Sequence, residues 1–175
     1  MSEQPLFPHP RRVVTGHDAD RNAIFVADSQ IPCVPTPANC NFAVLWETHR
    51  FPASNDGWED PILQKTKSLA NPNGIVLRVV DFKPNTKTVF HRTESLDFGI
   101  VVEGEITCYL DNGVELDFKR GDVCIQRGTI HGWENKTDKP ARVYFVLSAA
   151  EPVKIGDKVL GTTGFEDKDV ESGGK

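Results

Sequence analysis

Two short stretches of this chain contain the residues that could do chemistry together. The first runs from Pro84 to Gly104 and holds His91 and Asp97, and the second runs from Gly121 to Asn135 and holds His131. Two imidazoles and one carboxylate on neighbouring strands can hold a divalent metal and leave coordination positions open for a substrate or for oxygen. We therefore predict that His91, Asp97 and His131 are metal ligands.

The elements that must position these residues have the pattern of short β-strands. Val, Ile and Phe recur in partly alternating runs, and turn residues such as Asp111-Asn112-Gly113 separate the runs. Many short strands at regular spacing predict an all-β fold, an antiparallel sandwich or barrel. One short helix is expected within Pro61 to Ala70, because proline suits a first helical turn. The expected strands are Ala23 to Ala27, Asn41 to Thr48, Gly74 to Phe82, Phe98 to Val102, Glu105 to Asp111, Val114 to Lys119, Asp122 to Gln126, Gly132 to Lys136 and Ala141 to Ser148.

The length of 175 residues suits one domain with a hydrophobic core. We predict a single domain over residues 1–160, with its core barrel at about residues 74–150. Residues 161–175 are rich in Gly, Asp, Glu, Lys and Ser. This tail has too few apolar side chains to offset its own ordering entropy, so we expect it to be flexible.

The charge and hydropathy patterns argue against several partners. The net charge is −5, and no cluster of Lys or Arg could serve nucleic acid or an anionic membrane. No apolar run has the length of a membrane span, and the N-terminus lacks the apolar core of a signal peptide. We expect a soluble, cytoplasmic protein with no nucleic-acid or membrane partner. Its cysteines are then expected to be reduced and structural, namely Cys33, Cys40, Cys108 and Cys124.

The two chemical stretches resemble the two conserved motifs of the cupin superfamily. The first family motif has His-x-His followed by Glu and Gly, and the second has Gly, then Pro-x-Gly-x-x-His, then Asn. The runs at 91–93, 97–105 and 126–133, together with 11–17 and 45–48, look like a group of small single-domain cupins of bacteria and fungi. The resemblance implies an antiparallel jelly-roll β-barrel with an N-terminal strand extension, a homodimer, and a metal and a small ligand in the barrel mouth.

Three positions depart from the family pattern. Thr93 stands where a second His is usual, Asp97 replaces Glu, and Gln126 takes the place of Pro. The remaining ligand set suits one divalent ion, and Fe, Mn, Ni and Zn all accept mixed nitrogen and oxygen ligands. The alternative is a metal-free polar cluster in which Asp97 accepts hydrogen bonds from both imidazoles. A buried carboxylate beside two imidazoles is costly without a cation, and this cost favours the metal.

Further residues are candidates for proton transfer or for contact with a small-molecule substrate. His49 and Tyr144 are the candidate catalytic groups, because a histidine bound to a metal is a poor proton shuttle. His49 lies on a segment that could fold across the barrel mouth. The candidate substrate-binding residues are Arg78, Thr93, Arg127 and Trp133. Plainer alternatives are a solvated loop for His49, an outer strand face for Arg78, the rim for Arg127 and plain core for the aromatic residues.

The residues and the resemblance together leave several classes of function open. The first is a metal-dependent enzyme of lyase or isomerase type, which decarboxylates, dehydrates or cyclises a small oxygenated organic molecule. An Fe(II)-dependent dioxygenase is the alternative enzyme. A non-enzymatic ligand-binding barrel and a purely structural barrel are the other classes. The resemblance also implies a setting in natural-product biosynthesis.

Overall fold

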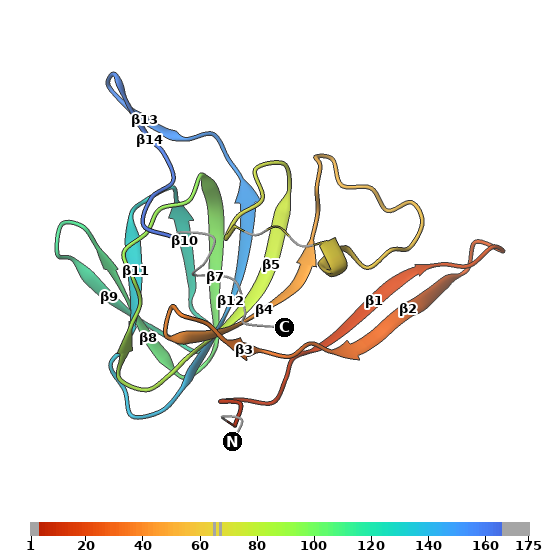
Figure 1. The fold of residues 1–175 in the computed structure, drawn as a ribbon, viewed down its shortest axis with the longest axis horizontal. Coiled ribbons are helices and arrows are strands. Elements are labelled where there is room, and N and C mark those ends of the chain that lie inside the picture. Colours follow the sequence, from red (N-terminus) through yellow and green to blue (C-terminus); the bar gives the residue numbers. More distant parts are fainter. Residues whose placement is uncertain (1–3, 65, 67, 166–175) are drawn as a thin grey trace.

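Two antiparallel sheets form the body of the molecule (Figure 1). The structure is a computed structural model that describes residues 4–64, 66 and 68–165. The six-stranded sheet has the order β10 (Val123–Arg127), β7 (Ser95–Glu103), β12 (Ala141–Ala149), β5 (Ile75–Phe82), β4 (Cys40–Glu47) and β3 (Val34–Pro35). The four-stranded sheet has the order β6 (Thr86–Lys87), β11 (His131–Asn135), β8 (Glu105–Leu110) and β9 (Glu115–Lys119).

One hydrophobic cluster fills the space between these sheets. The six-stranded sheet contributes Val80, Phe82 and Phe145, and the four-stranded sheet contributes Ile106 and Trp133. Alternate residues of a strand point to opposite faces, so each strand sends every second side chain into this cluster. The inner face of the six-stranded sheet is therefore one wall of the interior, and the inner face of the four-stranded sheet is the other.

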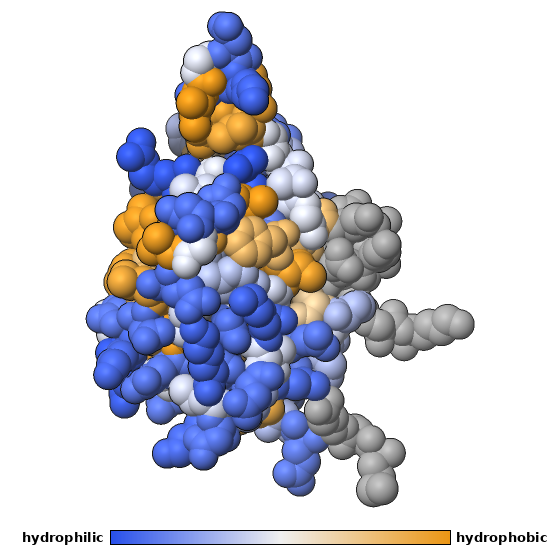
Figure 2. All heavy atoms as spheres, turned by 90° about the vertical axis from the view of Figure 1, so that its left-hand side faces the viewer, coloured by the Kyte–Doolittle hydropathy of each residue, from blue (hydrophilic) through white to orange (hydrophobic). Residues whose placement is uncertain are grey.

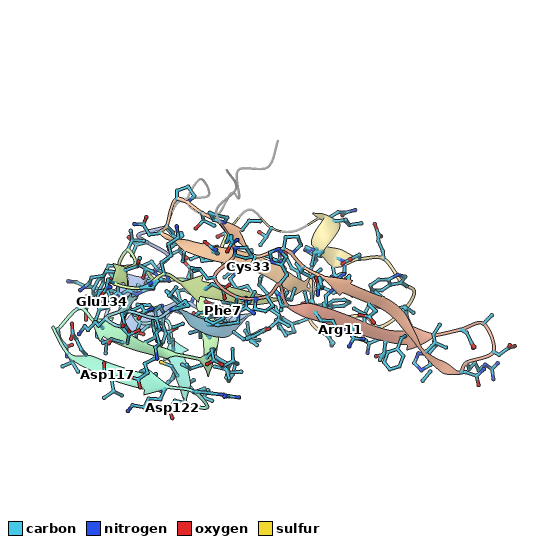
Figure 3. The ribbon with its side chains drawn as sticks, turned by 90° about the horizontal axis from the view of Figure 1, so that it is seen from below. Phe7, Arg11, Cys33, Asp117, Asp122 and Glu134 are labelled. Carbon is cyan, nitrogen blue, oxygen red and sulfur yellow. The ribbon has the colours of Figure 1, made fainter. Side chains whose placement is uncertain are left out.

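The outer face of the six-stranded sheet carries a buried ion pair. Arg142 donates to Asp81 from Nε and Nη2, at 2.6 and 2.7 Å, and from Nη1 to the carbonyl of Pro8 at 2.9 Å. The centroid of the Phe7 ring, which is labelled in Figure 3, lies 4.9 Å from the Arg142 guanidinium carbon. The N-terminal segment is thus tied to the back of the barrel, away from its interior.

Two hairpins project from the barrel. Strands β1 (Arg11–His17) and β2 (Ala23–Gln30) form a separate two-stranded sheet that extends to one side (Figures 1 and 3). Strands β13 (Val153–Ile155) and β14 (Lys158–Leu160) form the second hairpin, whose Ile155 is 64% exposed. Seen from the β9 side, this hairpin stands above the body and carries hydrophobic side chains (Figure 2).

The structure explains why a glycine and an asparagine occupy two positions of the motifs, Gly104 and Asn135. Gly104 has a φ of +76°, and a Cβ there would lie 2.7 Å from the carbonyl oxygen of Pro140. Asn135 is fully buried, and its amide donates to the carbonyl of Lys139 at 2.7 Å, which holds the turn before β12. These residues shape the turns around the barrel rather than its chemistry.

The expected all-β barrel is confirmed, with strands near every predicted range. Of the strands in the N-terminal extension, β3 and β4 join the six-stranded sheet of the barrel, whereas β1 and β2 form a sheet of their own. The short helix is a single 3-10 turn, η1 (Pro61–Gln64). No helix within residues 4–64, 66 and 68–165 is long and apolar enough to cross a membrane. All four cysteines are free thiols, with Cys33, Cys40 and Cys108 buried and Cys124 half-buried.

The start of the predicted flexible tail is packed against the barrel. Thr163 exchanges backbone hydrogen bonds with Arg92, at 2.9 and 3.0 Å. The ring of Phe165 meets the ring of His91 edge to face, with centroids 4.9 Å apart. The prediction for residues 166–175 lies outside the described residues.

Candidate functional site

A pocket lies between the two sheets, with about 490 Å³ of open space including its mouth. Most of its lining is apolar and much of it aromatic, as is typical of small-molecule sites with a few polar groups that orient the ligand. The lining residues are Cys40, Phe42, Leu69, Arg78, Val80, Phe82, Thr88, His91, Asp97, Gln126, His131, Trp133, Phe145, Leu147 and Phe165. The three predicted metal ligands therefore line one pocket.

His91 and His131 lie side by side at the pocket wall. Each backbone N–H donates to the carbonyl of the other residue at 2.9 Å, so the two positions form an isolated antiparallel bridge. The ring centroids are 4.4 Å apart. His131 begins β11 and is 3% exposed, whereas His91 is half-buried. The backbone pairing thus brings together two imidazoles that are far apart in the sequence.

Backbone carbonyls fix the tautomer of both imidazoles. Nδ1 of His91 lies 3.1 Å from the carbonyl oxygen of Val89, and Nδ1 of His131 lies 3.0 Å from that of Thr129. A carbonyl oxygen only accepts hydrogen bonds, so each Nδ1 carries the proton and donates it. In a neutral imidazole this leaves an unprotonated Nε2, the state that binds a metal or accepts a proton.

Burial keeps both imidazoles neutral. Desolvation, with a smaller contribution from the neighbouring His91, lowers the pKa of His131 to about 3. Desolvation is also the main cause that lowers the pKa of His91 below its usual 6.5. The pocket therefore presents two neutral nitrogen bases near neutral pH.

Asp97 lies on the opposite wall, on the inner face of β7. Its direct partners across the sheet are Gln126 of β10 and Leu147 of β12. Asp97 is 5% exposed. Thr93 Oγ1 donates to its Oδ2 at 3.4 Å, while Oδ1 has no hydrogen-bond partner within residues 4–64, 66 and 68–165. Burial raises the pKa of Asp97 to about 6, against the smaller opposing effects of Ser95, Thr93 and Arg78. This carboxyl can therefore hold or release a proton near neutral pH.

The fit of a metal rests on the histidine pair. Among the side chains that the structure describes, no three His, Cys, Asp or Glu residues form a group that could hold a metal ion. Asp97 shares the pocket with His91 and His131 but does not complete such a group with them. The two unprotonated Nε2 atoms are suitable ligands for a divalent cation that takes its other ligands from substrate or water. The three-ligand site stays a prediction.

Arg78 enters the pocket from β5 and is 3% exposed. It donates from Nη2 to the carbonyl of Leu69 at 2.9 Å, and its guanidinium lies over the Phe42 ring at 5.4 Å. Its Nε has no hydrogen-bond partner among the described residues. Burial lowers the pKa of Arg78 to about 10, so it remains a cation at neutral pH. The outer-face alternative for Arg78 is wrong, and its role in substrate binding stays a prediction.

The other predicted substrate-binding residues are placed differently from one another. Trp133 lines the pocket. Thr93 is buried but does not line the pocket. Its hydroxyl lies 2.7 Å from Ser95 Oγ and donates to Asp97 Oδ2. Arg127 is exposed and does not line the pocket, because Gln126 before it points inward and the next residue of β10 points outward.

The two predicted acid-base residues lie away from the pocket lining. Tyr144 follows Val143 and precedes Phe145, which both face the core, so it packs on the opposite face of the sheet beside Val79. His49 has a side chain that is 50% exposed, and its Nδ1 lies 3.0 Å from Asn71 Nδ2. The structure brings neither residue to the histidine pair. Of the residues that line the pocket, Asp97 is the one that could serve as the expected acid-base group.

Gln126 and Phe165 are among the pocket residues that sequence reasoning did not select. Gln126 was noted only as a replacement for proline, although an amide on an inward strand position is itself a polar signal. Phe165 was placed in the flexible tail, and no periodicity marks it as a wall of the pocket. The aromatic ring in a segment otherwise poor in apolar residues was the one available signal.

Comparison with known proteins places this geometry in a family. The model for "Cupin domain" matches residues 78–147. The chain is 35% identical over 168 residues to Phomopsin biosynthesis cluster protein C' of Diaporthe leptostromiformis, which covers 91% of this chain and 88% of that protein. It is 35% identical over 162 residues to Cupin-domain-containing oxidoreductase srdB of Neurospora crassa, covering 89% and 82%.

The fold has a counterpart among solved structures. An uncharacterized conserved protein with a double-stranded beta-helix domain from Klebsiella pneumoniae superimposes with a TM-score of 0.50 and 19% identity, over 75% of this chain and 89% of that one. This likeness concerns the fold alone. The barrel, the two motifs and the fungal relatives agree, and the chain belongs to the cupin family.

Proposed function

We propose that this protein is a metal-dependent enzyme of lyase or isomerase type that acts on a small oxygenated organic molecule in natural-product biosynthesis. The observation that carries the proposal is the pair of neighbouring imidazoles, each with Nδ1 committed to a backbone carbonyl and Nε2 free in an apolar pocket. His91 and His131 would hold the ion. When bound, a divalent cation polarises a substrate carbonyl and stabilises the negative charge that develops on it.

Asp97 is the proton-transfer group in this proposal. Its carboxyl is buried in the pocket, and burial brings its pKa to about 6, close to the pH at which an acid or base is most effective. Removal of a proton next to a carbonyl group is a step shared by isomerisation, dehydration and cyclisation. The apolar walls exclude water from the pocket and orient the substrate against Asp97.

Oxidation is the second candidate function. The relative in Neurospora crassa is named a cupin-domain-containing oxidoreductase, and this name favours an oxygen- or redox-dependent reaction. The name of the Diaporthe leptostromiformis relative supports the biosynthetic setting for either reaction.

Elemental analysis and turnover together test the proposal. We expect tag-free protein to bind one divalent ion per chain, and His91→Ala and His131→Ala to bind at least about tenfold more weakly. His17→Ala, an exposed histidine on the β1–β2 hairpin, is the matched control and retains the ion. Turnover without oxygen supports the lyase or isomerase, and oxygen consumption during turnover supports the oxidation. Wild-type protein that takes up no divalent ion contradicts the metal.

We further expect a homodimer. The β1–β2 hairpin extends from the barrel and carries Phe25, which is 75% exposed, and an exposed aromatic ring on a projecting hairpin is suited to contact with a second copy. Light scattering of wild-type and Phe25→Ser protein tests this, since a monomer at both would contradict the expectation.

A further inference from the structure

Gln126 and Asp97 leave hydrogen-bonding capacity unused inside the pocket. Gln126 is 4% exposed, and among the residues that the structure describes neither its Oε1 nor its Nε2 has a partner. Asp97 lies directly opposite on the neighbouring strand, and its Oδ1 is also without a partner in the described part of the chain. Both residues line the same pocket. Three unpaired polar atoms therefore lie together on one wall.

Unpaired polar atoms of this kind are costly. A buried donor or acceptor without a partner costs about 1–3 kcal/mol, and most buried polar groups in folded proteins are paired. Apolar side chains do occur on this strand, but Val123 and Ile125 lie on its outward face, whereas the polar Gln126 lies on the inward face. An amide and a carboxyl that lie side by side on the inward face, with atoms left without hydrogen bonds, point to a ligand group that supplies those bonds.

A hydroxyl group matches this pair. It donates one hydrogen bond and accepts others, so a single hydroxyl can donate to Asp97 Oδ1 and accept from Gln126 Nε2. An anionic ligand group fits this pair less well, because the ionised carboxylate of Asp97 would repel it. The remaining walls include the rings of Phe42, Trp133 and Phe145, which suit a flat apolar body.

We propose that Gln126 and Asp97 form the subsite that recognises a neutral hydroxyl group on an aromatic ligand. The inference rests on the proposed function in one respect, since it takes this ligand to be the enzyme's substrate. The hydroxyl lies against the β7–β10 wall, and the rest of the ring extends towards His91 and His131 on the other wall. Gln126 is thus a specificity-determining residue at the position where the cupin motif usually has proline.

Binding of simple probes to chelator-treated protein tests the subsite without metal or turnover. The probes are phenol and toluene, and their binding is followed by calorimetry or by the fluorescence of the tryptophans, of which Trp133 lines the pocket. Wild-type protein is expected to bind phenol more tightly than toluene. Gln126→Met is expected to weaken phenol binding by about three- to tenfold and to leave toluene binding within about twofold. Gln30→Met, the same change at an exposed position at the end of β2, is the matched control and changes neither.

Several outcomes overturn the inference. Equal losses for phenol and toluene in Gln126→Met mean that Gln126 only shapes the pocket. Unchanged phenol binding in that variant, or no preference for phenol in wild-type protein, means that the pair holds water only. Misfolding does not confuse the result, because Gln126→Met removes unpaired buried atoms and its melting temperature is expected to equal or exceed that of wild type. Failure of metal binding in the His91 and His131 variants would leave the phenol preference in place, so the two proposals fail separately.

Discussion

Replacing Asp97 by Asn should make the metal-free protein more stable at neutral pH. Asp97 is 5% exposed, and burial raises its pKa from 3.8 to about 6. The folded state therefore binds this proton more tightly than the unfolded state does. Below pH 3.8 both states are protonated and the acid costs nothing. As the pH rises from 3.8 to about 6, the unfolded state releases this proton while the folded state still holds it, so stability falls until both states are ionised.

The size of the effect follows from the pKa change. At about 1.4 kcal/mol per pKa unit, a rise from 3.8 to about 6 corresponds to roughly 3 kcal/mol, an upper limit reached above pH 6. Asn cannot ionise. The free energy of unfolding of Asp97→Asn minus that of wild type should therefore increase by up to about 3 kcal/mol between pH 4 and pH 7. The hydrogen bonds from Ser95 and Thr93 favour the ionised form, and their effect is already contained in the pKa of about 6.

Urea unfolding of chelator-treated protein at several pH values measures this difference. Because both proteins keep His91 and His131, the contributions of the imidazoles cancel in the subtraction. Asp111→Asn, an exposed site at the β8–β9 turn, is the control and should change stability by less than about 0.5 kcal/mol at any pH. A difference that is flat, or that shrinks towards neutral pH, would refute the reasoning. It would mean that Ser95, Thr93 and Arg78 together stabilise the ionised Asp97 at least as much as burial opposes it.

Two further predictions concern the frame around the pocket. Arg142→Met leaves the charge of the fully buried Asp81 uncompensated and should lower the free energy of unfolding by about 3–5 kcal/mol. Asp81→Leu combined with Arg142→Met should recover much of this loss, and urea unfolding measures both variants. Gly132→Ala places a Cβ 2.2 Å from the Tyr109 hydroxyl and should cost about 1–3 kcal/mol, measured in the same way; a loss below about 0.5 kcal/mol would mean that the Tyr109 ring moves freely.

The fold could be predicted because local patterns and family motifs agree. Alternation in segments such as Ala141–Ala149 marks strands that bury one face, and Asp111-Asn112-Gly113 marks the turn between two of them. Strand β1 (Arg11–His17) was missed as a strand, since its burial alternates only between exposed and half-buried positions and leaves no apolar period to detect. The 3-10 turn and the packing of Phe165 depend on contacts with distant strands.

The candidate site could be predicted in part. Motif spacing was enough to select His91, Asp97 and His131 as residues of one pocket, and Trp133 as part of its lining. It could not place His49 or Tyr144, because the face of a strand on which a residue lies depends on register. Tyr144 is one residue away from the pocket-lining Phe145, and that single step puts it on the other side of the sheet.

The sequence by itself determined the barrel and the polar residue types within it, because strand alternation and turn chemistry are local properties of the chain. Only the tertiary structure decided how those residues are distributed. The His91–His131 backbone bridge puts both imidazoles on one wall, while the register of β7 with β10 puts Asp97 and Gln126 together on the other. The physical reason is that register and burial arise from pairing between distant strands, and burial in turn sets the proton affinities of Asp97 and His131.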